Sequence, residues 1–225
     1  MHIEPGLVDG TKLLLSYATA TAALAYTAKL AWGMVKHNGA VALLLRSVIA
    51  SVLVFVFFEV FPHHPVGISE VHLILGTTLL LIFGAAPAAI GLATGLLVQS
   101  VFFAPQDLPQ YGMNVTTLLV PLFATVVLAR RVIPENMAYV DLSYAQTFKL
   151  SVAYQGGIVL WVGFWAIYGH GVGVENLASI GSFGAAYMTV VLLEPLIDLG
   201  VLAMAKSWRR LQGSAVLERR VYQAA

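Results

Sequence analysis

The residues with the clearest potential for chemistry stand at the start of the chain, in the pair Met1-His2. A free α-amine, the next backbone amide nitrogen and the imidazole of His2 can close two fused chelate rings around one divalent metal ion. Three nitrogen donors in a plane favour Ni(II), Cu(II) or Co(II) over Mg(II) and Ca(II), which prefer oxygen. A methionine followed by a residue as large as histidine is normally not removed, so we expect Met1 to keep its amine. The opposing interpretation is that position 2 is a histidine by accident.

The composition indicates a membrane protein. The chain has 225 residues, of which 59% are hydrophobic and 10% are charged, and its mean hydropathy is +0.85. Soluble domains carry about 25% charged residues. Because the chain has no cysteine, it has neither a disulfide nor a thiolate metal site, and a bound metal must be held by nitrogen and oxygen. The net charge of +1 gives no indication of nucleic-acid binding.

Hydropathy predicts an all-α, polytopic membrane protein with about seven transmembrane helices. A helix needs roughly 20 apolar residues to cross the hydrocarbon core. Segments of this kind are found at 13–36, 40–61, 66–83, 86–104, 114–133, 150–168 and 178–205. A turn is predicted at Gly84-Ala85-Ala86-Pro87, because residues 66–104 are too long for one straight helix.

The positive charges orient these spans. If the N-terminus is outside, the inner segments hold nine of the twelve lysines and arginines, and the outer loops 62–65, 105–113 and 169–177 hold none. Since cytoplasmic loops are enriched in Lys and Arg, we expect the N-terminus outside and the C-terminus inside. Residues 1–205 then form a transmembrane domain that begins with the N-terminal segment 1–12, and 206–225 form a basic cytoplasmic tail.

The first twelve residues are unlike a cleavable signal peptide. They carry Glu4 and Asp9 and precede a full-length apolar segment, so we expect the N-terminus to be retained in the mature protein. In the predicted topology, five of the six histidines lie at or near the outer face. These five are His2, His63, His64, His72 and His170.

Three motifs resemble those of a known family. Met1-His2-Ile3-Glu4-Pro5-Gly6 is similar to the Met-His-Ile-x-x-Gly start of the CbiM/NikM family. Its members are the substrate-binding membrane components of energy-coupling-factor cobalt and nickel transporters, which are ABC transporters. The stretch from Val66 to Gly76 resembles the family's Gly-Thr-Ser-Gly-His-Leu-x-Gly motif, and Gly112-Met113-Asn114 resembles its Gly-Ala-Asn element. The order of the motifs and the seven-span layout agree as well, so the resemblance extends to about residue 205. It implies that residues 1–205 are a transmembrane substrate-binding domain and that 1–12 is its functional N-terminal segment.

The resemblance implies a near-square-planar site of four nitrogens. Three come from the Met1 amine, the His2 amide and the His2 imidazole, and the fourth comes from a loop histidine that matches His72. The chain departs from the family motif at this point, because one extra residue separates Ser69 from the histidine. Two alternative histidines are therefore kept as candidates for the fourth ligand, His63 and His64.

Three polar residues near these motifs are candidates for orienting an imidazole: Ser69, Glu70 and Asn114. The alternative interpretation of each is a loop cap or a turn residue.

The resemblance also implies partner proteins. The chain has no G-x-x-x-x-G-K-[ST] sequence and cannot hold ATP in a P-loop. In the family, the chain works with a transmembrane coupling protein and a pair of cytoplasmic ABC ATPases, often beside a small accessory membrane protein. Two pairs of small residues, Ala18/Ala22 and Gly91/Gly95, provide close-packing helix faces, either inside the bundle or for the coupling protein. The implied substrate is Co(II) or Ni(II), and we expect no prosthetic group, no enzymatic activity and a location in the plasma membrane.

Two other functions are compatible with the sequence. Glu194 and Asp198 lie four residues apart in the last predicted span, and carboxylates within a membrane often mark cation or proton pathways. They would suit a gradient-driven secondary transporter, although we favour a structural role, such as an ion pair with Lys29 or Arg46. The remaining alternative is a scaffold subunit that binds no metal. Metal capture at the outer face, with release inward driven by ATPase partners, is the leading hypothesis.

Overall fold

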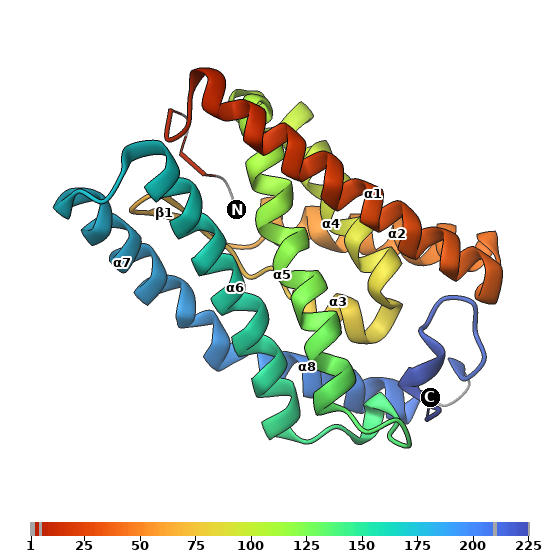
Figure 1. The fold of residues 1–225 in the computed structure, drawn as a ribbon. Helices are drawn as coiled ribbons and strands as arrows, with labels where there is room; N and C mark the ends of the chain where they lie inside the picture. Colours follow the sequence, from red (N-terminus) through yellow and green to blue (C-terminus); the bar gives the residue numbers. More distant parts are fainter. Residues whose placement is uncertain (1–2, 5, 209–210, 225) are drawn as a thin grey trace.

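The computed structural model describes residues 3–4, 6–208 and 211–224, and this part of the chain is almost entirely helical (Figure 1). A short antiparallel hairpin, β1 (His64–Val66) and β2 (Ser69–Val71), interrupts the helices. The main helices are α1 (Leu13–Asn38), α2 (Ala40–Phe55), α3 (Gly76–Phe83), α4 (Ala85–Phe102), α5 (Tyr111–Val132), α6 (Tyr144–His170), α7 (Val174–Met188) and α8 (Val190–Ser207).

The all-α, polytopic prediction is confirmed. Five helical segments in the described residues are long and apolar enough to cross a membrane, namely Ala40–Val60, Ala85–Phe102, Pro105–Val132, Tyr144–His170 and Val174–Ser207. Helix α1, with 26 residues, occupies the first predicted span. The count of seven spans and the orientation of the termini stay predictions.

The predicted helical span 66–83 is wrong. Its first half forms the hairpin and a loop, and only the eight residues of α3 are helical, which is about 12 Å of helix. Pro65 and Gly67 favour the turn over a helix, and Gly67 adopts a φ of 63° that suits glycine. The predicted break between the third and fourth segments is confirmed at Gly84, which has a φ of 90° and separates α3 from α4, whereas Ala85, Ala86 and Pro87 form the first turn of α4.

Helix α5 runs through the middle of the molecule, where it contacts α1, α4 and α6 (Figure 1). Helix α4 packs closely along α2. A Cβ added at Gly91 would lie 2.5 Å from the Cβ of Ala50, and one at Gly95 would lie 2.6 Å from a methyl group of Val54. The Gly91/Gly95 pair therefore packs inside the bundle, whereas Ala18 and Ala22 on α1 are exposed.

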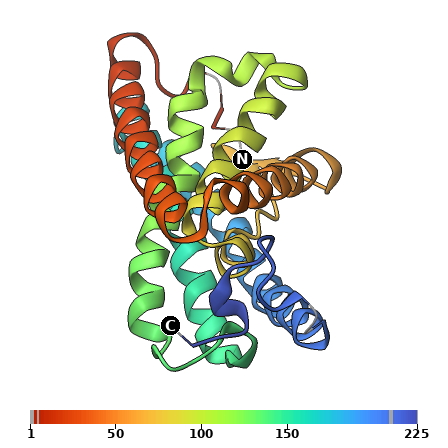
Figure 2. The same ribbon diagram turned by 90° about the vertical axis from the view of Figure 1, so that its right-hand side faces the viewer.

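The C-terminal segment 211–224 folds back near the end of α8 (Figure 2). The backbone N–H of Glu218 donates to the carbonyl of Ile82 at 2.7 Å, close to the end of α3. The hydroxyl of Tyr222 donates to the carbonyl of Ala205 on α8, and Val221 is fully buried. The segment thus covers the end of α3 that is remote from the hairpin.

Candidate metal centre

The segment that follows Met1-His2 is docked between the hairpin and α5. Ile3 is fully buried, and its backbone N–H donates to Asn114 Oδ1 at 2.9 Å. Ile3 also forms an antiparallel bridge with Ser69 of β2, and the N–H of Glu4 donates to the carbonyl of Ile68 at 3.2 Å. The start of the chain is therefore added to the hairpin by backbone hydrogen bonds, as a third short strand would be.

His72 lies directly after β2 and is buried, with 1% of its surface exposed. Its Nε2 forms a 2.9 Å hydrogen bond with Glu70 Oε2, which fixes the tautomer with the proton on Nε2. The His72 ring stacks on His63, with 4.9 Å between ring centroids and 12° between planes, and meets the ring of Phe58 edge-on. Packing and one carboxylate thus hold the imidazole in a single orientation.

The three loop histidines lie in different environments. His72 and His63 are brought together, whereas His64 in β1 is exposed, as is His170 at the end of α6. The other predicted ligands, Met1 and His2, lie outside the described residues. Within the described ranges, no group of three or more His, Asp or Glu side chains is placed to hold a metal ion.

The three residues predicted to orient an imidazole have different neighbours. Glu70 does bind an imidazole, that of His72. Asn114 and Ser69 instead contact the backbone of Ile3, so both position the N-terminal segment. All three lie around the junction of this segment with the hairpin.

Two buried carboxylates lie on α8. Glu194 is fully buried, and its Oε2 accepts hydrogen bonds from Ser151 Oγ at 2.5 Å and from Gln155 Nε2 at 2.7 Å, both on α6. Glu194 also lies beside the backbone amide and the hydroxyl of Thr77.

Asp198, one turn further along α8, binds the first turn of α3. Its Oδ2 accepts a 2.8 Å hydrogen bond from Thr77, and its Oδ1 accepts a hydrogen bond from Thr78. Hydropathy alone could not predict that Asp198 and Glu194 bind α3 and α6. The sequence feature that could have predicted the contact of Asp198 is the pair Thr77-Thr78, which directly follows the histidine motif in an otherwise apolar segment.

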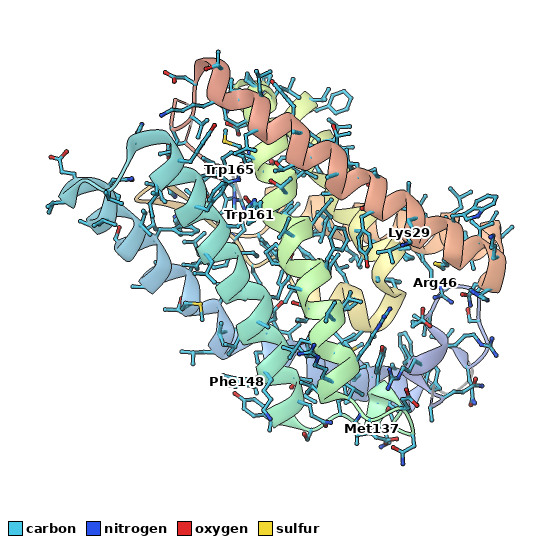
Figure 3. The ribbon with its side chains drawn as sticks, viewed as in Figure 1. Lys29, Arg46, Met137, Phe148, Trp161 and Trp165 are labelled. Atoms are coloured by element: carbon cyan, nitrogen blue, oxygen red, sulfur yellow. The ribbon has the colours of Figure 1, made fainter. Side chains whose placement is uncertain are left out.

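The predicted ion pair of these carboxylates with Lys29 or Arg46 is wrong. Arg46 binds Glu218 at 2.8 Å instead, and Lys29 is exposed on α1. Figure 3 shows both side chains on the side of the molecule where α1 and α2 lie. The ion pairs formed by described residues include neither Glu194 nor Asp198. Hydrogen bonds from four side chains, rather than a basic residue, surround the two acids.

Five apolar helical segments long enough to span a bilayer, within the described residues, define a multi-pass membrane protein. A family model described as "cobalt uptake substrate-specific transmembrane region" matches residues 2–210. The chain therefore belongs to the CbiM family, as the motifs predicted. It is a component of cobalt uptake, and the family is one of transporters, not of enzymes. Neither the curated proteins nor the solved structures gave a match.

Proposed function

We propose that this protein is the substrate-capture component of an energy-coupling-factor ABC transporter for Co(II) or Ni(II). The ion is held by the amine of Met1, the amide and imidazole of His2 and the imidazole of His72. The observation that carries the proposal is the docking of Ile3 between Asn114 and Ser69, which lies three residues before the buried His72.

Backbone hydrogen bonds at Ile3 and Glu4 support this assignment, because they anchor the residues that directly follow the chelating pair. A ligand set built from a chain terminus is flexible on its own, and anchoring lowers the entropic cost of closing the chelate. Two of the four proposed donors, the Met1 amine and the His2 amide, are main-chain nitrogens, and the other two are imidazoles. Such donors select nickel and cobalt over magnesium and calcium.

The fourth ligand is assigned to His72 over His63 and His64. His72 is buried and belongs to the loop that follows β2, the strand that bridges to Ile3. His63 stacks on His72 but is only half-buried, and His64 is exposed. Glu70 orients the His72 ring, as a carboxylate that accepts a hydrogen bond from a metal-binding imidazole commonly does.

The proposed partners are a transmembrane coupling protein, a pair of cytoplasmic ATPases and a small accessory membrane protein. The exposed Ala18 and Ala22 on α1 leave one face of small residues open to another helix. This face suits the coupling protein, whereas the Gly91/Gly95 face is already filled by α2. The proposal keeps the N-terminus outside, the C-terminus inside and residues 206–225 in the cytoplasm.

The test is Ni(II) and Co(II) binding to detergent-purified protein that begins at Met1, compared with a variant that carries one extra alanine before Met1. We expect 1:1 binding that the added residue abolishes, because the amine is moved out of the chelate ring. Equal binding by both proteins, or binding by neither, would contradict the N-terminal site.

Histidine variants assign the remaining ligand. His72→Ala should weaken nickel binding, and His64→Ala is the matched control, since His64 is exposed. If His63→Ala weakens binding and His72→Ala does not, the fourth ligand is His63.

A further inference from the structure

The first turn of α3 connects the His72 loop to the acids on α8. Only Leu73, Ile74 and Leu75 separate His72 from Gly76, where α3 begins. The next two residues, Thr77 and Thr78, are the ones that bind Asp198. A contact on α8 therefore acts on the chain five residues from the imidazole.

This junction is tightly packed. Ile74 is fully buried, and Leu75 is 5% exposed with a left-handed φ of 55°. A left-handed conformation is unfavourable for leucine, so the surrounding contacts must hold it. At Gly76 an added Cβ would overlap the ring of Tyr154 on α6, so the chain has no room to shift towards that helix.

The acids are suited to holding this turn. Anionic groups are stabilised at the N-terminus of a helix, where backbone N–H groups have no partner within the helix. Asp198 binds the two threonine hydroxyls there, and Glu194 lies beside the Thr77 amide. Ser151 and Gln155 tie Glu194 to α6 in turn. Helices α3, α6 and α8 are thus joined by one buried network.

We propose that Glu194 and Asp198 are positioning residues for the metal site, which fix the first turn of α3 and through it the place of the His72 imidazole. This inference rests on the proposed function, because it assumes that His72 is a metal ligand. It assigns the carboxylates neither to ion transport nor to direct contact with the metal.

The experiment is a double-mutant cycle on Ni(II) affinity, using Asp198→Asn and Glu194→Gln in the unmodified protein and in His72→Ala. In the unmodified protein we expect each substitution to weaken binding roughly 10-fold, the usual size for residues that orient a ligand. In the His72→Ala background we expect each substitution to change the Ni(II) affinity by less than about twofold, because the acids act on binding through the His72 imidazole and that imidazole is absent.

Cu(II) bound to the same proteins gives a second readout. Its electron paramagnetic resonance spectrum reports how many nitrogens surround the ion. In Asp198→Asn, the bound Cu(II) should have one nitrogen ligand fewer and keep the three of the N-terminal chelate. His72→Ala should give the same spectrum. A substitution that only destabilises the bundle would not remove one specific ligand.

Thr78→Val is the milder variant if an acid variant fails to fold, because Thr78 is only half-buried. Thr125→Val is its control, since the Thr125 hydroxyl bonds only within its own helix α5. Unchanged affinity in every variant, or an equal loss in both backgrounds, would overturn the inference. If the unmodified protein binds no metal, the proposed function fails first.

Discussion

The hydrogen bond between Ile3 and Asn114 gives the most direct prediction about the capture site. We consider Asn114→Ala, which removes the acceptor at 2.9 Å from the Ile3 amide. Both residues are fully buried, so the Ile3 N–H loses its partner away from bulk solvent. An unsatisfied buried N–H costs about 1–3 kcal/mol. The docked form of the N-terminal segment should therefore become less stable by about 2 kcal/mol.

This loss of stability weakens metal binding if the N-terminal segment must be docked for the metal to bind. A loss of about 2 kcal/mol corresponds to roughly 30-fold weaker Ni(II) binding, since every 1.4 kcal/mol is tenfold. Isothermal titration calorimetry measures the affinity, and hydrogen exchange at Ile3 and Glu4 measures the docking. Faster exchange should accompany the weaker binding.

Thr117→Val is the matched control for Asn114→Ala. Thr117 lies one turn further along α5, is equally buried, and donates only to the carbonyl of Met113 in its own helix. We expect its effect on Ni(II) affinity to stay within about twofold. Unchanged affinity in Asn114→Ala, or an equal loss in both variants, would refute the reasoning.

Three further predictions concern packing, charge and pH. Gly95→Ala should lower stability by about 1–3 kcal/mol in thermal unfolding, because its Cβ would overlap Val54, whereas Gly33→Ala, which meets nothing within 4 Å, should not. Arg46→Ala should lower stability by about 3 kcal/mol in the same assay; this is the lower end of the usual range, since Glu218 is 26% exposed. Ni(II) affinity should rise with pH, because the amine, with a pKa near 8, and the amide both lose protons on binding. Near pH 7, below the amine pKa of about 8 and above the ordinary imidazole pKa of about 6.5, the slope should approach 100-fold per pH unit, and a slope near tenfold would show that only one proton is released.

Most helices could be predicted from the sequence, because long apolar segments favour helices in a membrane protein. The structure of the third segment could not be predicted in this way. Residues 66–83 are as apolar as their neighbours, but hydropathy does not distinguish a packed hairpin and short helix from a span. Pro65 and Gly67 were the local signals for the turn.

The candidate site was predictable in part. The motifs singled out His72, Glu70 and Asn114. The structure places Asn114 on the amide of Ile3 and Glu70 on the imidazole of His72. The true partners of Asp198 and Arg46 could not be predicted, because Thr77 and Glu218 are 121 and 172 residues away along the chain. Charge alone favoured a simple ion pair, whereas hydroxyl donors satisfy Asp198 in the folded protein.

Helix α3 is held at both ends by distant parts of the chain. Arg46 Nη1 donates to the carbonyl of Phe83 and the Glu218 amide donates to that of Ile82, while Asp198 binds the opposite end. An eight-residue helix is too short to bend appreciably, so it moves as one rod. The C-terminal segment and the His72 loop are therefore attached to opposite ends of one short rigid helix, so a displacement of either end is coupled to the other.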